Sequence, residues 1–309
     1  MKPGVVATTE ALVGPSVLAR VRDWSSMTRP RIGGFVFFAA LTGALVSGAE
    51  PSLARAAEAG AWIALSAAGA SVFNQILEKQ SDAFMRRTAE RPLPTGRIGV
   101  REALLFGTVL EAAAIAGLAL RFELLAALLA LATFASYVLV YTPLKRLSGL
   151  NTVVGALPGA MPPLLGALAL TGTPSPLAWS LFAILFAWQF PHFMAIGWLY
   201  RDDYRSAGIR MLPAFGVRGV AGLQAIGYSL VCLLVSLVPA MQGRAGVLYA
   251  VAAAVLGLAY VASSIHFARR EDDARARVLL RCSLVYLPLV YACLLLDPLV
   301  RSSSVLAAS

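Results

Sequence analysis

Three polar side chains recur at intervals of four residues in an apolar stretch of the chain: Asn74, Glu78 and Asp82. On an α-helix this spacing turns by only about 40° per step, so the three would share one face. Carboxylates on one face repel each other unless a cation bridges them. Two carboxylates and an amide suit Mg²⁺, which completes its octahedron with water and phosphate oxygens. The alternative interpretation is a solvated helix end, where charged residues are ordinary.

A second acidic pair, Asp202 and Asp203, follows a later apolar stretch. Arginines flank both acidic motifs, which is the pattern of a two-sided clamp for a Mg²⁺–diphosphate. The first motif leads into Arg91-Pro-Leu-Pro-Thr-Gly96, where two prolines and a glycine predict a rigid turn. Arginines are also expected beside membrane spans for topological reasons, so each one taken alone is weak evidence.

His192 stands inside an apolar stretch, next to Pro191 and about 15 Å from Asp202 by helical rise. Ionisable groups within a membrane are costly and therefore mark function by default. The alternative is a hydrogen-bonded core histidine. The other histidine, His266, is predicted to lie at the solvated end of a span.

The elements that must position these residues are membrane helices. Only 14% of the 309 residues are charged and the mean hydropathy is +0.74, whereas a soluble domain carries roughly a quarter charged residues. A water-soluble α-solenoid would show polar faces at helical period, and these stretches show almost none. The ~20-residue length criterion predicts about nine spans. They are Ile32–Gly48, Glu58–Leu77, Glu102–Leu120, Phe122–Tyr141, Asn151–Leu170, Leu177–Leu199, Val220–Met241, Ala245–His266 and Val278–Leu296.

The distribution of basic residues predicts the orientation of these spans. Of 26 Lys and Arg residues, all but Arg55, Arg121, Arg244 and Arg301 lie in the N-terminal segment or after even-numbered spans. The positive-inside rule makes that side cytoplasmic, with both acidic motifs on it and the C-terminus outside. The net charge of +10 therefore reflects topology and does not indicate nucleic-acid binding.

We expect residues 1–31 to form a cytoplasmic N-terminal segment, with a short surface helix between Glu10 and Trp24, and residues 32–309 to form one transmembrane domain. No signal-peptide pattern is present. Glu10 and Asp23 argue against a mitochondrial presequence, which favours a bacterial inner membrane. The three cysteines, in apolar segments, show no metal-ligand spacing.

The motifs together resemble those of the UbiA-type intramembrane prenyltransferases. Within that superfamily they resemble the haem-prenylating branch, the protohaem IX farnesyltransferases. The stretches that carry the resemblance are Asn74-x-x-x-Glu78-x-x-x-Asp82, Met85-Arg-Arg-Thr88, Arg91-Pro-Leu-Pro-Thr-Gly96, Tyr141-Thr-Pro-Leu-Lys-Arg146, Pro158-Gly-Ala-Met-Pro-Pro163, Trp188-Gln-Phe-Pro-His192-Phe and the Asp202 to Pro213 segment. Gln80 departs from the pattern, because the family often has aspartate there.

The resemblance implies an all-α fold of nine transmembrane helices around a central cavity. It also implies transfer of the farnesyl group of farnesyl diphosphate to a vinyl group of haem B, giving haem O. Carried over to this sequence, the Mg²⁺–diphosphate ligands would be Asn74, Glu78, Asp82, Asp202 and Asp203.

Other roles follow from the same resemblance. His192 would serve as a haem-iron ligand or as an acid/base near the vinyl group. The implied partners are the bilayer, the two substrates and a downstream enzyme that oxidises haem O. Diphosphate charge would be neutralised by Arg87, Arg91, Lys145 and Arg146, and the cavity walls would draw on Phe73, Tyr137, Trp188, Phe190 and Phe193.

Two alternatives remain open at the level of sequence. The same fold could prenylate another acceptor, such as a quinone precursor or a chlorophyllide. A transporter of an anionic lipid or metabolite is the alternative from another class, although such a protein should show related halves, and no internal repeat is evident.

Overall fold

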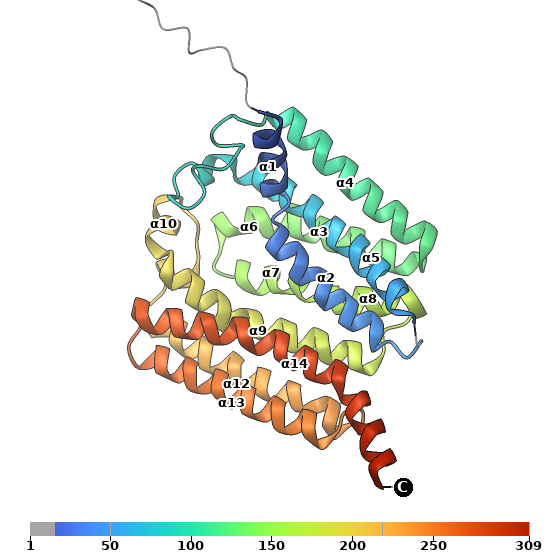
Figure 1. Cartoon of the computed structure of the whole chain (residues 1–309). Helices are drawn as coiled ribbons and strands as arrows, with labels where there is room; N and C mark the ends of the chain where they lie inside the picture. Colours follow the sequence, from blue (N-terminus) through green and yellow to red (C-terminus); the bar gives the residue numbers. More distant parts are fainter. Residues whose placement is uncertain (1–15, 50, 218, 309) are drawn as a thin grey trace, which may run out of the picture.

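The computed structural model describes residues 16–49, 51–217 and 219–308, and side chains up to residue 298. The described residues contain helices and no strands (Figure 1). In chain order they are α1 (Val17–Met27), α2 (Pro30–Leu45), α3 (Leu53–Asp82), α4 (Val100–Arg121), α5 (Leu124–Ala135), the π-helical turn η1 (Ser136–Tyr141), α6 (Thr142–Leu147), α7 (Asn151–Ala160), α8 (Pro162–Thr171), α9 (Pro176–Leu199), α10 (Arg201–Ser206), α11 (Leu212–Phe215), α12 (Val220–Met241), α13 (Val247–Arg269) and α14 (Asp273–Ala308).

Eight helical segments of the described chain are long and apolar enough to cross a membrane. The first predicted span is the exception, because α2 has only 16 residues. At 1.5 Å per residue it extends about 24 Å, short of the ~30 Å hydrocarbon layer. The all-α, polytopic fold is therefore confirmed, with eight full-length spans and one short helix. The eight are Leu53–Asp82, Val100–Arg121, Leu124–Leu147, Asn151–Thr171, Pro176–Leu199, Val220–Met241, Val247–Arg269 and Asp273–Pro298.

Two of the predicted spans are not continuous α-helices. The predicted span Asn151–Leu170 is divided into α7 and α8, and Pro162 begins α8 because proline lacks the N–H that a continuing helix would need. The predicted span that ends at Tyr141 runs on through η1 into α6. Pi-helical turns of this kind are frequent at functional sites. Here the Thr142 hydroxyl donates to the Tyr137 carbonyl across the turn, 2.9 Å away.

The N-terminal half is held together by close backbone approaches between small residues. A Cβ on Gly43 of α2 would lie 2.0 Å from the Pro163 carbonyl oxygen, and one on Gly166 of α8 would lie 2.0 Å from that of Ala40. Only glycine permits such contact, and small residues at helix interfaces are typical of membrane bundles. Helices α2, α3 and α8 therefore form a tight wall on which α4 and α5 pack.

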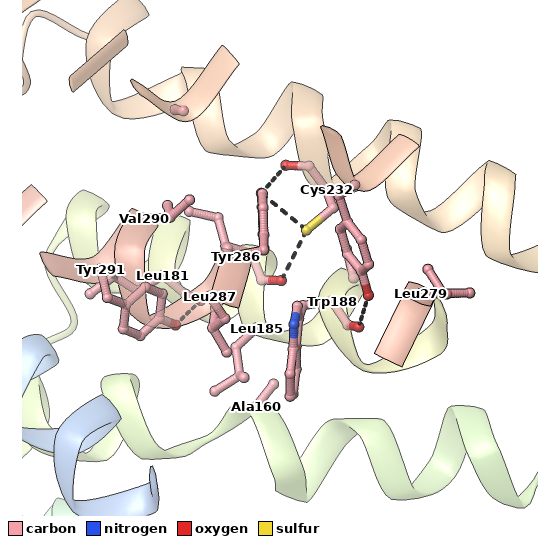
Figure 2. Close-up of a cluster of buried hydrophobic side chains, with 14 of the residues drawn as sticks. Ala160, Leu181, Leu185, Trp188, Cys232, Leu279, Tyr286, Leu287, Val290 and Tyr291 are labelled. Atoms are coloured by element: carbon pink, nitrogen blue, oxygen red, sulfur yellow. Dashed lines mark hydrogen bonds between the residues drawn. The ribbon is translucent and has the colours of Figure 1, made fainter. Parts of the chain in front are cut away.

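The C-terminal half packs α9 against α12 and α14, and α13 against the same two helices, around buried aromatic side chains (Figure 2). The tyrosine hydroxyls in this core all have partners: Tyr291 donates to the Leu181 carbonyl at 2.7 Å, and Tyr286 lies 3.3 Å from Cys232 Sγ. Buried polar groups must be satisfied internally where no water is available. This half is thus a fixed scaffold for α9, which carries His192.

The two ends of the bundle differ in charge. The α3–α4 connection, α6 and α10 lie together at one end, and the C-terminus lies at the opposite end (Figure 1). At that opposite end, Glu58 pairs with both Arg55, at 3.0 Å, and Arg121, at 2.8 Å. Two of the four basic residues predicted to lie outside are thereby paired with one carboxylate. The side chain of Arg301 lies outside the described part of the chain. The first six residues of the predicted Glu10–Trp24 helix, Glu10 to Pro15, also lie outside the described residues.

Candidate active site

The last three turns of α3 carry a buried polar face. Asn74, Glu78 and Asp82 are exposed by only 0%, 7% and 1%, so the spacing of four residues does place them together, facing the interior. Gln80, two residues from Glu78 and on another side of the helix, is exposed. This arrangement argues against a solvated helix end.

Both carboxylates of this face are held by cations from other segments. Lys145 Nζ of α6 lies 2.8 Å from Glu78 Oε1, and Arg91 Nη1 of the α3–α4 connection lies 2.6 Å from Asp82 Oδ2. The second oxygen of Asp82, Oδ1, is buried and has no hydrogen-bond partner. A buried acceptor without a hydrogen-bond donor is energetically costly. Such an unpaired buried group indicates an ion or ligand site.

Asn74 links α3 to two other helices. Its amide nitrogen donates to Thr142 Oγ1 at 3.1 Å, and its carbonyl oxygen accepts from Arg29 at 3.0 Å. Arg29 has φ 50°, a left-handed conformation that costs a residue with a side chain roughly 1–2 kcal/mol. Backbone strain of this sort is typical of functional sites.

Arg29 is a site residue that the sequence reasoning missed. The sequence places Arg29 only within the N-terminal segment, residues 1–31, that precedes the first predicted span. Its position before Pro30 disfavours the right-handed helical region, which predicts a helix boundary but not the contact with Asn74. A hydrogen bond from Gln75 to the Met27 carbonyl, 2.7 Å long, further ties the N-terminal segment to α3.

The donor set of α3 fits a hard divalent cation. Glu78 and Asp82 supply carboxylate oxygens, Asn74 an amide oxygen, and Asp82 Oδ1 is unpaired. Among the described residues, no group of three or more His, Cys, Asp or Glu side chains is placed to hold a metal ion. A cation here would therefore need water and phosphate oxygens to complete its coordination, as Mg²⁺ commonly does.

The second acidic motif lies on α10, at the same end of the bundle (Figure 1). The Asp202 side chain is 80% exposed and pairs with Arg205 at 3.2 Å, whereas Asp203 is half-buried. Two contacts join this segment to the connection that follows α3: Ser206 Oγ donates to the Phe84 carbonyl, and the Arg87 guanidinium stacks 4.8 Å from the Tyr200 ring. The two motifs are thus neighbours, but not one carboxylate cluster.

The four predicted diphosphate-binding cations lie around the end of α3. Arg146 approaches Ser81 Oγ at 3.3 Å, and Lys145 also lies 4.6 Å from the centre of the Tyr141 ring. Partial burial and the neighbouring Arg29 lower the pKa of the Arg91 guanidinium, which still stays charged because its ordinary pKa is so high. An anion bound beside Arg91 would stabilise the charged form of its guanidinium.

The predicted rigid turn after α3 is present and positions Arg91. Thr88 Oγ1 donates to the Asp82 carbonyl at 2.8 Å. The backbone amides of Thr95 and Ile98 donate to the carbonyl oxygens of Arg91 and Pro92, respectively. The side chains of Leu93 and Ile98 are buried against α1, α3 and α4. The loop is therefore packed, and its arginine has a defined place.

An apolar pocket lies along α3 beyond the acidic face. Its cavity volume is about 130 Å³, and its lining is almost entirely apolar. Ser71, its lining residue nearest the motif, precedes Asp82 by eleven positions, about 17 Å of helix. The lining residues are Ile32, Val36, Ile63, Ser66, Ala67, Ala70, Ser71, Ala130, Thr133, Phe134, Tyr137, Pro158, Gly159, Pro162 and Leu165.

Of the five aromatic residues predicted as cavity walls, only Tyr137 lines this pocket. Phe73 packs edge-on against Phe134, a lining residue, at 5.3 Å between ring centres. Phe190 instead stacks on Tyr228 of α12, and Trp188 is buried in the C-terminal half. Most of these aromatic side chains therefore serve packing.

His192 does not line the pocket either. It lies between α9 and α14, half-buried, with Nδ1 2.8 Å from Ser283 Oγ. Its ring stacks on Trp188, with 4.6 Å between ring centres, and Trp188 in turn stacks on Phe35 of α2. The histidine thus occupies a separate place where α2, α9 and α14 come together.

Comparison with known proteins relates the chain to one family. The pattern of the UbiA prenyltransferase family matches residues 35–285. A protein of Solibacter usitatus named protoheme IX farnesyltransferase is 41% identical over 289 residues, spanning 90% of this chain and 99% of that protein. A protein of the same name from Koribacter versatilis is 39% identical over 299 residues, spanning 93% and 96%.

Solved structures share the arrangement of helices. A UbiA homologue from Aeropyrum pernix K1 superimposes with a TM-score of 0.70 at 21% identity, covering 85% of this chain and 96% of its own. A UbiA homologue from Archaeoglobus fulgidus bound to GPP and Mg²⁺ gives 0.64 at 16% identity, covering 88% and 99%. At these identities the likeness shows the fold.

Proposed function

The chain belongs to the UbiA prenyltransferase family, and from that premise we propose that it transfers the farnesyl group of farnesyl diphosphate to a vinyl group of haem B, giving haem O. It is a multi-pass membrane enzyme. The observation that carries the proposal for this chain is the buried polar face of α3, where Asp82 keeps one oxygen unpaired while the other accepts from Arg91. Family membership disfavours the transporter alternative, and the names of the relatives favour haem over a quinone precursor or a chlorophyllide.

We assign the diphosphate to the end of α3. Asn74, Glu78 and Asp82 would hold a divalent metal, for which we propose Mg²⁺, and Asp202 and Asp203 would complete the site from α10. A metal ion bound there supplies charge that stabilises the diphosphate leaving group. The support is the fit of the oxygen donors described above and the Mg²⁺ and GPP bound by the Archaeoglobus fulgidus relative.

The cations around α3 bind the rest of the diphosphate charge. Lys145 and Arg91 each contact a carboxylate at 2.8 Å or less, so a diphosphate bridging metal and cations would replace these contacts rather than meet free side chains. Groups that grip the diphosphate more strongly as negative charge develops lower the barrier. Arg87, Arg146 and the newly identified Arg29 would add to this effect.

The farnesyl chain would extend from this site along α3 into the apolar pocket. Cleavage of the C1–O bond sends its electron pair to diphosphate and leaves an allylic cation. The haem vinyl π-electrons then form the new C–C bond, and water adds to the resulting cation with loss of a proton. An apolar chamber lined by small and aliphatic residues such as Ala70 and Leu165 keeps water away until that last step.

Haem B would contact His192 where α2, α9 and α14 come together. The histidine lies outside the apolar pocket, so it would contact the acceptor and not the prenyl chain. Its role is that of an iron ligand or of an acid/base near the vinyl group. A downstream enzyme that oxidises haem O is the expected consumer of the product.

We further propose a bacterial inner membrane as the location, with residues 1–31 as a cytoplasmic segment and 32–309 as a single domain. The end of the bundle that carries both acidic motifs would face the cytoplasm. Contacts such as that of Arg29 with Asn74 cross the proposed boundary, so the N-terminal segment contributes to the site.

This orientation predicts the behaviour of reporter fusions. A reporter fused after Ser309 should be active outside the cytoplasm, and one inserted near Gly96 should be active inside. An alkaline phosphatase fusion reports a position outside the cytoplasm, and a fluorescent-protein fusion reports a position inside it. Activity of both fusions on one side of the membrane would refute the proposed topology.

Arg29→Gly should separate the effect of the Arg29 backbone conformation on stability from the effect of its side chain on binding. Glycine accepts φ 50° without strain, so the variant should be as stable as the parent or about 1 kcal/mol more stable. It should nonetheless bind farnesyl diphosphate more weakly, because a charge-assisted contact with Asn74 and the anion is lost. Titration calorimetry with a non-hydrolysable farnesyl diphosphate analogue measures the effect. Arg31→Ala, an exposed arginine two residues on, is the control, and equal affinity in the two variants would remove Arg29 from the site.

Haem analysis of membranes tests the function in cells. In a host that lacks its own haem O, expression of the chain should make haem O appear in membrane extracts. Expression of the Asp82→Asn variant should leave haem B unmodified. Absence of haem O, with both proteins present in the membrane, would contradict the proposal.

A further inference from the structure

The hydroxyl of Ser283 lies between the His192 ring and the backbone of α14. Ser283 is fully buried, and its Oγ is 2.8 Å from His192 Nδ1 and 2.7 Å from the Leu280 carbonyl oxygen. The carbonyl of Ser283 accepts a second bond, from Trp188 Nε1 at 2.7 Å. Trp188 also stacks on the His192 ring at an interplanar angle of 24°. One residue of α14 thus holds both aromatic rings of the pair.

The donors and acceptors around His192 determine which of its two ring nitrogens carries the proton. A serine hydroxyl has one proton to donate, and the carbonyl of Leu280 can only accept. When the Ser283 hydroxyl donates to that carbonyl, the contact with His192 needs Nδ1–H as the donor. In the neutral ring, Nε2 then carries the lone pair.

We infer that Ser283 is a positioning residue that fixes His192 as the Nδ1–H tautomer, with the Nε2 lone pair free to meet the acceptor. The contact that His192 makes with haem rests on the proposed function, whereas the tautomer does not. A lone pair on Nε2 is what either an iron ligand or a proton acceptor needs. Ligating histidines characteristically donate their other ring nitrogen to such a partner, which fixes ring orientation and basicity.

The tautomer can be read directly, because the chain contains only two histidines. Protein labelled with ring-¹⁵N histidine in lipid bilayers should give two imidazole signal sets, and His266→Gln assigns the set of His192. We expect the Nδ1–H form in the parent and in Ser283→Thr, which keeps the hydroxyl. Ser283→Ala should shift His192 towards the Nε2–H form. An Nε2–H ring in the parent, or an unchanged spectrum in Ser283→Ala, would overturn the inference.

A matched control separates this effect from the loss of any buried serine. Ser229 of α12 is also fully buried and donates to the carbonyl three residues before it, Ile226, at 2.9 Å. Ser229→Ala removes the same kind of bond without touching the histidine. Its histidine spectrum should match the parent, and a shift equal to that of Ser283→Ala would make the effect a general loosening of the bundle.

Haem binding connects the tautomer to function. Ser283→Ala should lower the affinity for haem B roughly tenfold, as loss of partners behind a ligating histidine commonly does, and should leave the KM for farnesyl diphosphate unchanged. Ser283→Thr should restore the affinity. Parental haem affinity together with a parental kcat in Ser283→Ala, with haem O still formed by the parent, would refute only the role of Ser283, because an acid/base His192 would lower kcat instead of affinity. A parent that forms no haem O, with the Nδ1–H tautomer still observed, would refute only the proposed function.

Discussion

Asp82→Asn is expected to abolish haem O formation while the protein still inserts and accumulates. The substitution keeps the shape of the side chain and removes the negative charge beside Arg91, where Oδ1 is unpaired and Oδ2 accepts at 2.6 Å. Loss of one preorganised electrostatic group costs roughly 10²–10³-fold in kcat, and loss of a metal ligand should exceed that. The measurement is turnover of farnesyl diphosphate and haem B at saturating Mg²⁺. The amide is preferred to alanine, because leaving Arg91 buried without a partner would also destabilise the fold.

Glu58→Gln is the matched control for Asp82→Asn. Glu58 also lies on α3 and pairs with arginines, but at the opposite end of the bundle. It should lose little activity, since solvent screens these ion pairs and Glu58 lies far from both acidic motifs. Near-normal turnover in Asp82→Asn would remove this residue from the site, and equal losses in both variants would indicate a general effect on α3. The same experiment with Asp203→Asn tests the contribution of α10.

His192→Ala is expected to lose haem O formation while farnesyl diphosphate still binds with near-native affinity. The reason is spatial: His192 contacts Ser283 and Trp188 and lines neither the α3 face nor the apolar pocket. Removal of a group that acts as acid or base typically costs 10²–10⁴-fold. Calorimetry with the diphosphate analogue measures binding of the prenyl donor, and turnover of haem B measures the reaction at the acceptor.

The haem spectrum of the same variant distinguishes the two roles of His192. A changed spectrum with lost activity supports iron ligation, and an unchanged spectrum with lost activity supports the acid/base role. His266→Ala removes an exposed histidine at the end of α13 and should behave as the parent. If His192→Ala forms haem O at the normal rate, the histidine is only a packed core residue.

Much of the fold could be predicted from hydropathy and charge, because a bilayer requires long apolar helices. The exceptions have local causes. The first span is short because α2, which begins at Pro30, already ends at Leu45, and the fifth is broken where Pro162 cannot continue a helix. The length of α3 was underestimated, since the polar residues from Glu78 to Asp82 end the apolar run but not the helix.

The candidate site could be predicted in part. A spacing of four residues suffices to place Asn74, Glu78 and Asp82 on one face, because helical geometry is regular. The partners of that face could not be predicted, since Arg29 and Lys145 reach it from distant segments through a left-handed residue and a π-helical turn. The place of His192 beside Ser283, 91 residues away, likewise depends on tertiary packing. The metal and diphosphate roles of these residues stay predictions.

Mass analysis of haem after incubation with the purified protein tests the central claim most directly. The protein in nanodiscs would receive haem B, farnesyl diphosphate and Mg²⁺, alongside a parallel sample with a quinone-precursor acid in place of haem B. The proposed function predicts a haem product heavier by one farnesyl group and one hydroxyl group, formed only when metal is present and absent with Asp82→Asn. Unmodified haem B together with a prenylated quinone precursor would contradict the claim and leave a UbiA-family enzyme with a different acceptor.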